Sequence, residues 1–288
     1  MELREYFAQA KAEGWAIGHF NFATADVLRA IVEGAMRAGA PCVLVGTSPG
    51  EAEFLGMAEA VALVQAARRS AEFPVFLNAD HFASFDACKE AIDAGYDSVL
   101  FDGSRLAYEV NVIETQRVWQ YAQTKRGSFM VEAEVGYLKG RSEVQTEVVI
   151  GRDDFTKPEQ AADFIRRTGV ERFAPVFGNI HGIVTKQEEV LDIEHLARVA
   201  AAIPDAYLVL HGASGLPDEQ VVSAIRTGIT NVHFNTELRV AYQRELKEEL
   251  AEHPGQTTPY RYLQSADDAV RDVVEQKCRL FMAARIHP

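Results

Sequence analysis

The stretch that decides the fold is Tyr207-Leu208-Val209-Leu210, followed at once by His211-Gly212-Ala213-Ser214-Gly215. Four consecutive apolar residues without polar alternation are typical of a strand buried on both faces, as in a parallel sheet covered by helices. The histidine is a possible metal ligand, and the glycine-rich turn after it lets backbone N–H groups approach an anion such as a phosphate. Taken alone, the stretch fits a capped strand with an ordinary turn equally well. Its interpretation as a site depends on recurrence of the pattern elsewhere.

The pattern does recur, because strand-like and helix-like stretches alternate along the chain. Eight stretches are predicted to be strands: 16–21, 42–46, 74–80, 98–102, 129–135, 173–177, 207–211 and 231–235. Helix-like segments lie between them, at 25–37, 52–69, 85–94, 108–125, 158–167, 193–202 and 218–226. Several of these end at a glycine, the residue favoured just past a helix C-terminus. Eight β/α alternations with short connections predict a (β/α)8 TIM barrel, with residues 1–288 forming one domain.

Two regions depart from a minimal barrel. Residues 137–157 are too long and polar for a tight βα connection, and we predict a mobile loop over the barrel mouth. After the eighth strand, residues 237–252 and 266–284 are predicted to form extra C-terminal helices. We expect this helical extension either to cap the barrel or to form a contact between subunits of an oligomer.

The composition limits the classes of partner. With 48% hydrophobic and 25% charged residues, the chain resembles soluble globular proteins that form a sizeable core. Its net charge of -13 disfavours nucleic-acid binding, because a polyanion would be repelled over most of the surface. The three cysteines indicate neither a disulfide framework nor a Cys-rich zinc site, and the first residues are charged where a secretion signal is apolar. We therefore expect a cytoplasmic protein that binds neither nucleic acid nor membranes.

Polar residues stand at the carboxyl ends of the predicted strands, where barrel enzymes place catalytic groups. His81, His181 and His211 are far apart in sequence, but closure of a barrel brings their strand ends to a common rim. Three neutral imidazoles leave a divalent ion with open positions, which is the catalytic arrangement. A single histidine at a strand end is more often a hydrogen-bonded structural residue. Four others lack this context and are predicted to be structural or exposed: His19, His195, His253 and His287.

The strand ends lie within longer motifs. In chain order these are Asn78-Ala79-Asp80-His81, Val131-Glu132-Ala133-Glu134-Val135-Gly136, Asn179-Ile180-His181-Gly182, Leu210-His211-Gly212-Ala213-Ser214-Gly215-Leu216-Pro217 and Asn235-Thr236-Glu237-Leu238. The set resembles the successive motifs of the class II, metal-dependent ketose-bisphosphate aldolases, a family that includes the fructose- and tagatose-bisphosphate enzymes. The resemblance runs over about residues 18–274, in the right order.

The resemblance implies a role for each matching residue. His81, His181 and His211 would hold a catalytic zinc or another divalent metal, and Asp80 would be the acid or base at the aldehyde oxygen. Asp102 and Glu134 match positions that bind the metal in an alternative location. The residues implied in binding substrate or its phosphate are Asn21, Gly182, Lys186, Gly212, Ala213, Ser214, His233, Asn235 and Thr236. A monovalent cation, Na⁺ or K⁺, near the phosphate is also a family feature.

The implied reaction is reversible cleavage of a ketose (bis)phosphate to glycerone phosphate and an aldehyde, as in glycolysis. The aldehyde is glyceraldehyde 3-phosphate if fructose or tagatose bisphosphate is the substrate. A metal stabilises the negative charge that cleavage leaves on the ketone half. A carboxylate of the 137–157 loop would move the C3 proton, with Glu143 the first candidate and Glu147 the second. A homodimer or homotetramer is expected.

Three positions depart from the family pattern. Phe82 replaces a frequent glycine and is expected to narrow the local space, and His233 replaces a substrate-binding asparagine. Asp267 aligns with an arginine associated with the distal phosphate, so either a neighbouring arginine (Arg271 or Arg261) compensates or the aldehyde lacks that phosphate. Two alternatives remain open at this point: a metal-dependent sugar-phosphate isomerase or epimerase, and a catalytically silent sugar-phosphate binder.

Overall fold

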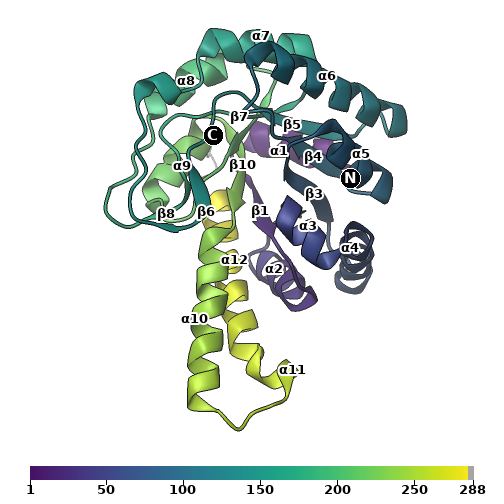
Figure 1. Cartoon of the computed structure of the whole chain (residues 1–288), viewed down its shortest axis with the longest axis vertical. Helices are drawn as coiled ribbons and strands as arrows, with labels where there is room; N and C mark the ends of the chain where they lie inside the picture. Colours follow the sequence, from purple (N-terminus) through teal and green to yellow (C-terminus); the bar gives the residue numbers. More distant parts are fainter. Residues whose placement is uncertain (285–288) are drawn as a thin grey trace.

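A computed structural model describes residues 1–284 of the chain. Eight parallel strands close into a barrel in the order β1-β10-β9-β7-β5-β4-β3-β2 (Figure 1). Their bounds are β1 (Ile17–Asn21), β2 (Val43–Thr47), β3 (Val75–Phe82), β4 (Ser98–Phe101), β5 (Met130–Glu134), β7 (Arg172–Ala174), β9 (Tyr207–Leu210) and β10 (Ile229–Phe234). All eight predicted strands and the TIM-barrel fold are thereby confirmed.

Helices cover the outside of the barrel. They are α2 (Ala25–Arg37), α3 (Pro49–Leu55), α4 (Met57–Ala71), α5 (Phe85–Ala94), α6 (Tyr108–Lys125), α7 (Pro158–Thr168), α8 (Ile193–Ala202) and α9 (Asp218–Arg226). The single helix predicted over 52–69 is in fact two, because Gly56 has a φ of 90° and separates α3 from α4. Pro49 occupies the first turn of α3, where its missing N–H has no consequence.

The N-terminal helix α1 (Leu3–Glu13) is not among the predicted elements. Its apolar face buries Tyr6 and Phe7 in a cluster with Ile17, Leu44 and Met130, which come from three barrel strands. These residues belong to the first halves of their strands, so α1 closes the end of the barrel that is opposite the predicted site. That end stabilises the fold and leaves the carboxyl ends of the strands free for chemistry.

The predicted mobile loop contains regular structure. Within it, β6 (Gly140–Gln145) pairs in parallel with β8 (His181–Val184), and a short helix, η1 (Arg152–Asp154), follows. The side chain of Gln145 strengthens the pair by donating to the carbonyl of His181 at 2.7 Å. The loop is therefore tethered to the segment that carries a predicted metal ligand, and its mobility stays a prediction.

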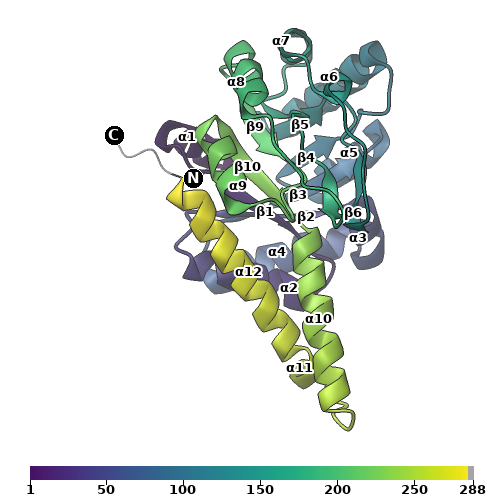
Figure 2. The same ribbon diagram turned by 90° about the vertical axis from the view of Figure 1, so that its left-hand side faces the viewer.

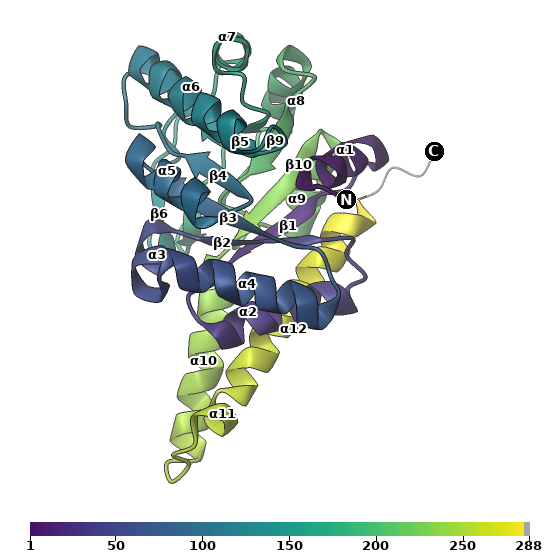
Figure 3. The ribbon, with the colours of Figure 1, turned by 90° about the vertical axis from the view of Figure 1, so that its right-hand side faces the viewer.

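The C-terminal extension is a pair of long helices. α10 (Thr236–Glu252) and α12 (Gln264–Ala283) confirm the predicted helices, and the short α11 (Pro259–Tyr262), which was not predicted, lies between them. The two long helices project together beyond the barrel (Figures 1, 2 and 3), and α12 buries Val270, Val274 and Phe281. Among the described residues, no helix is long and apolar enough to cross a membrane.

Candidate active site

A cavity of about 260 Å³ opens at the carboxyl ends of the strands. Most of the residues predicted for the site line it, namely Asn21, Asp80, His81, Asp102, Glu134, His181, Gly182, His211, Gly212, Ala213, Ser214, His233, Asn235 and Thr236. Phe82, expected to narrow this space, is instead buried in the core and is not among the lining residues. The barrel thus gathers side chains that are up to 215 positions apart, from Asn21 to Thr236, around one cavity.

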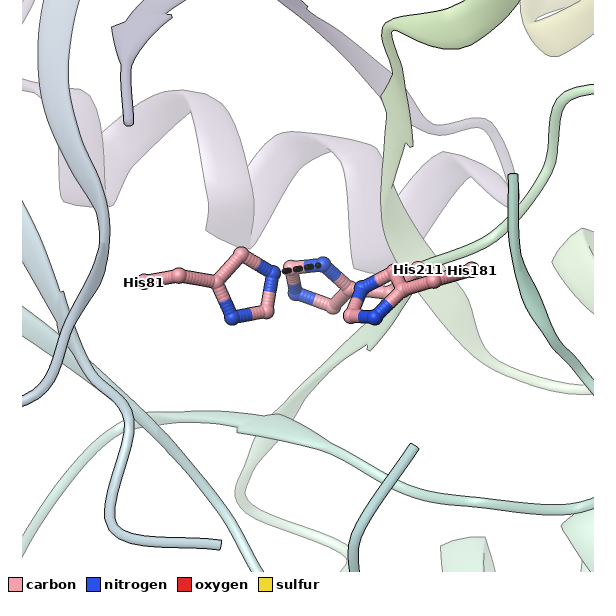
Figure 4. A group of neighbouring side chains, drawn as sticks. All are labelled: His81, His181 and His211. Carbon is pink, nitrogen blue, oxygen red and sulfur yellow. Dashed lines mark hydrogen bonds between the residues drawn. The ribbon is translucent and has the colours of Figure 1, made fainter. Parts of the chain in front are cut away.

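Three histidines converge at the centre of this cavity. The nitrogens that His81, His181 and His211 offer to a metal all lie within 4.8 Å of one another, and the rings point toward a common centre (Figure 4). His81 Nε2 lies 3.2 Å from His211 Nδ1. His81 has a φ of 56°, a left-handed conformation that is uncommon outside glycine, where β3 loses its regular register with β4. This local strain turns the imidazole into the cavity.

Carboxylates surround His81 on its other side. Its Nδ1 lies 3.1 Å from Asp102 and 4.0 Å from Glu134. Burial alone would lower the pKa of His81, but the carboxylates of Asp80, Asp102 and Glu134 outweigh it and raise the pKa to about 10. The centre of the cavity therefore favours positive charge, which a bound cation would supply.

A buried ion pair that the sequence analysis assigned no role holds His211 in place. Glu132 accepts a hydrogen bond from His211 Nε2 at 2.7 Å and forms an ion pair with Arg172, and both Glu132 and Arg172 are fully buried. Arg172 donates further to Asn231 at 2.8 Å and to Asn78 at 3.3 Å. Because Nε2 carries the proton donated to Glu132, Nδ1 of His211 is unprotonated, and its lone pair faces His81 Nε2 at 3.2 Å, toward the position that a metal would take.

This ion pair makes a stability prediction. Glu132→Gln is expected to lower the free energy of unfolding of the metal-free protein by about 3–5 kcal/mol, because the Arg172 guanidinium would stay buried without a counter-charge. Urea denaturation measures the change. The matched control is Glu245→Gln, which removes a surface pair with Arg244 and should cost less than about 1 kcal/mol. Equal effects of the two substitutions would contradict the prediction.

Both carboxylate oxygens of Asp80 have close polar neighbours, and one of them accepts a hydrogen bond. Its Oδ2 accepts from Asn21 Nδ2 at 2.9 Å, and its Oδ1 lies 3.2 Å from His233 Nδ1. His233 stacks on His19 with ring centroids 3.7 Å apart. Burial would raise the pKa of Asp80, but the neighbouring histidines, His81 first, hold it well below its usual range. Asp80 is thus an ionised, rigidly oriented carboxylate beside the proposed metal position.

Three histidines that were predicted to be structural or exposed have such surroundings in the structure. His19 is fully buried and bonded to Asn78 at 3.2 Å, while His195 bonds the carbonyl of Thr156 at 2.8 Å. His253 is exposed at the end of α10. His287 lies outside the described residues.

Glycines and a helix N-terminus form another part of the cavity wall, the glycine-lined wall. Gly182 and Gly212 have φ values of 92° and 72°, and an added Cβ would come within 2.1 Å of the carbonyls of Arg141 and Ile180. Only glycine fits these positions, which bring the backbone to the cavity surface. Ser214 and Thr236 complete the wall, and α10 begins at Thr236. The positive end of the helix macrodipole and the exposed backbone make this wall suitable for a phosphate.

Two predicted residues are not brought into the cavity, and several others join it. Glu143 and Lys186 are exposed and are not among the lining residues. The cavity also contains residues to which the sequence analysis assigned no role: Ser48, Arg105, Tyr137, Leu138, Gly140, Ser142 and Arg239. Most of these come from loops whose position depends on tertiary packing. Four of them, Tyr137, Leu138, Gly140 and Ser142, belong to the loop predicted to lie over the barrel mouth, and for the other three the sequence signal was position after a strand.

Comparisons with known proteins agree with this geometry. The family model described as fructose-bisphosphate aldolase class-II matches residues 1–285. A fructose-bisphosphate aldolase of Staphylococcus epidermidis is 32% identical over 286 residues, covering 98% of this chain and 96% of the relative. Both matches extend over nearly the whole sequence.

Solved structures give the same answer for the fold. The YdjI aldolase of Escherichia coli K12 superposes with a TM-score of 0.83 at 28% identity, covering 97% of this chain and 96% of that one. Fructose-bisphosphate aldolase (Fba) of Campylobacter jejuni superposes with a TM-score of 0.82 at 21% identity, covering 97% and 93%. The barrel, the clustered histidines and the family match over residues 1–285 lead to one conclusion: this chain belongs to the class II fructose-bisphosphate aldolase family.

Proposed function

We propose that the protein is a metal-dependent aldolase that reversibly cleaves a ketose phosphate to glycerone phosphate and an aldehyde. The observation that carries the proposal is the convergence of His81, His181 and His211 beside the ionised Asp80, in a cavity that glycines also line. Family membership supports the same reaction class. The whole chain acts as one catalytic domain in this proposal, in the cytoplasm and in glycolysis or related carbohydrate metabolism, as a homodimer or homotetramer.

The residues present fit a divalent metal. Imidazole nitrogens are preferred ligands of zinc, and Glu132 orients His211 as an outer partner orients a ligating histidine. Burial, then the neighbouring imidazoles, lower the pKa of His181 well below its usual value, so this ligand is neutral. Asp102 and Glu134 would provide the alternative metal location on the far side of His81. When bound, the metal supplies positive charge that stabilises the enediolate left by breakage of the C3–C4 bond.

Asp80 moves the proton of the reacting oxygen. In cleavage its carboxylate accepts the proton of the C4 hydroxyl as the C3–C4 bond breaks, the aldehyde leaves, and the electron pair stays on the three-carbon ketone. In condensation Asp80 returns that proton to the aldehyde oxygen. The contacts with Asn21 and His233 orient the Asp80 carboxylate in the same way for cleavage and for condensation.

The glycine-lined wall holds the phosphate of the ketone half. Backbone N–H groups around Gly182 and from Gly212 to Ser214 would bind its oxygens, with Thr236 and the N-terminus of α10 beside them. Lys186, Asn235 and a sodium or potassium ion complete this phosphate site in our proposal. His233 lines the cavity where it can reach the ketone or its hydroxyl groups.

Glu143 is the proposed group that moves the C3 proton, and it faces solvent in the structure. Its neighbour Ser142 lines the cavity and contacts Thr236 at 3.1 Å, so a small rearrangement of β6 would bring Glu143 over the ketone. Glu143→Gln is expected to slow exchange of the C3 proton of dihydroxyacetone phosphate with deuterated water by about 100-fold. NMR follows the exchange, with Glu147→Gln as the matched control. If Glu147→Gln alone slows the exchange, the roles of the two residues are reversed.

The reaction class is tested by product analysis. Dihydroxyacetone phosphate and a panel of aldehydes are incubated with the zinc-loaded protein, and new ketose phosphates are identified by mass spectrometry. Formation of a C–C bond supports the proposal. Interconversion of sugar phosphates without any condensation product would identify an isomerase or epimerase, and binding without turnover would identify a silent binder.

A further inference from the structure

The position of Asp80 fixes where the aldehyde lies. If the proposed function holds, this carboxylate donates to the aldehyde oxygen, so the remaining aldehyde carbons extend over the residues beside it. Asn21, at the end of β1, touches Asp80, and Ser48, just after β2, lines the same cavity. The far end of the aldehyde therefore meets the wall formed by Asn21 and Ser48, which we call the aldehyde wall.

The hydrogen-bond donors of the aldehyde wall are already engaged. Asn21 Nδ2 donates at 2.9 Å to Asp80 and at 2.9 Å to Glu51, which accounts for both hydrogens of the amide. The backbone N–H of Ser48 donates to the same Glu51 oxygen at 2.8 Å. The orientation of the Asn21 amide is well determined, because both partners are carboxylates that can only accept when ionised. A phosphate at this wall would find these N–H groups occupied.

The negative charge at the aldehyde wall would also repel an anion. Glu51 and Asp80 place two carboxylates behind and beside it. Within the described residues, the arginines that line the cavity are Arg105 and Arg239. Their hydrogen bonds run to Tyr137 at 2.7 Å and to Ser142, in the 137–157 loop, and not to the aldehyde wall. Arg271 and Arg261, the candidates to compensate for Asp267, do not line the cavity, and Arg271 pairs with Asp268 at 2.6 Å.

We propose that Glu51 determines the specificity of the enzyme by selecting aldehydes that carry hydroxyl groups and no phosphate at the far end. The Glu51 carboxylate occupies the donors that an anion would need and repels a second negative charge at close range. A neutral polyhydroxy aldehyde avoids this repulsion, and its hydroxyls can donate to the Ser48 hydroxyl and to Asp80, which line the cavity, while Glu51 lies behind them. An account of Glu51 as only the capping residue of α3 predicts no dependence on substrate charge.

The test compares two aldehydes in condensation with dihydroxyacetone phosphate: D-glyceraldehyde and D-glyceraldehyde 3-phosphate. The native enzyme is expected to show a kcat/KM at least about 10-fold higher for the neutral aldehyde, since close like charges disfavour the wrong partner strongly. Glu51→Gln should move this ratio about 10-fold or more toward the phosphorylated aldehyde, mainly through KM. Glutamine retains an acceptor for the Ser48 N–H, so the cap of α3 is preserved.

Two control variants complete the design. Glu51→Asp keeps the charge and should keep the preference for the neutral aldehyde, and Glu53→Gln removes an exposed charge from the same helix and should change nothing. A native preference for the phosphorylated aldehyde, or a ratio unchanged in Glu51→Gln, would overturn the inference. If the native preference is for the phosphorylated aldehyde and Arg105→Gln abolishes it, Arg105 is the anion-binding group instead. Absence of a product with both aldehydes and with the rest of the panel would overturn the proposed aldolase function itself.

Discussion

Removal of the metal with a chelator is expected to lower aldol turnover by about 1000-fold or more, and added zinc or cobalt should restore it. The expected size follows from the several kcal/mol that a metal contributes to stabilising developing negative charge, at about 1.4 kcal/mol for each factor of ten in rate. Among residues 1–284, three converging histidines and no lysine line the cavity. Turnover is measured on chelated, dialysed and reconstituted samples.

The metal prediction has a matched pair of variants. His81→Ala removes one of the three converging imidazoles and should lower the bound metal to a small fraction of the native content, measured by elemental analysis. His253→Ala changes an exposed histidine on the projecting helix pair and should leave metal content and turnover unchanged. Full turnover by a sample shown to be metal-free would contradict the proposed mechanism.

The fold could be predicted because its strands have short, strongly apolar sequences. The run Tyr207-Leu208-Val209-Leu210 forms β9 and is largely buried, as a strand covered on both faces must be. The strand β6 could not be predicted in the same way, because its residues are mostly exposed and polar and it forms by pairing with β8. Helix α1 was not predicted because it is stabilised mainly by packing against the end of the barrel. A short amphipathic sequence does not reveal such tertiary packing.

The positions of His81 and His211 could be predicted from topology, since parallel strands in a barrel end at one rim, whereas His181 lies in β8, beyond the end of β7. The buried ion pair that holds His211 in place could not be predicted from the sequence. Glu132 and Arg172 are 40 positions apart and meet inside the barrel, where β5 and β7 are neighbours in register. In the sequence each of them is an ordinary charged residue. Only the folded structure shows that Glu132 bonds both Arg172 and His211 in the buried interior. The direction of Glu143 likewise depends on how β6 pairs with β8.

Asp80→Asn is expected to lower kcat by roughly 10²–10⁴-fold while leaving the metal content unchanged. The substitution keeps the size of the side chain and an oxygen that can accept from Asn21, so the aldehyde wall should remain in place. It removes the ability to take up and return the proton of the C4 oxygen. The neighbouring ligand His81 keeps its conformation, because β3 and its irregular register with β4 are untouched.

The measurement must separate loss of the proton carrier from loss of the metal. Turnover, metal content and exchange of the C3 proton of dihydroxyacetone phosphate are therefore measured on the same Asp80→Asn sample. Exchange should persist, since Glu143 moves that proton, whereas condensation with an aldehyde should nearly stop. Unchanged turnover would remove Asp80 from the mechanism. Loss of exchange together with metal would show that Asp80 supports the histidine cluster, and its role would then be structural.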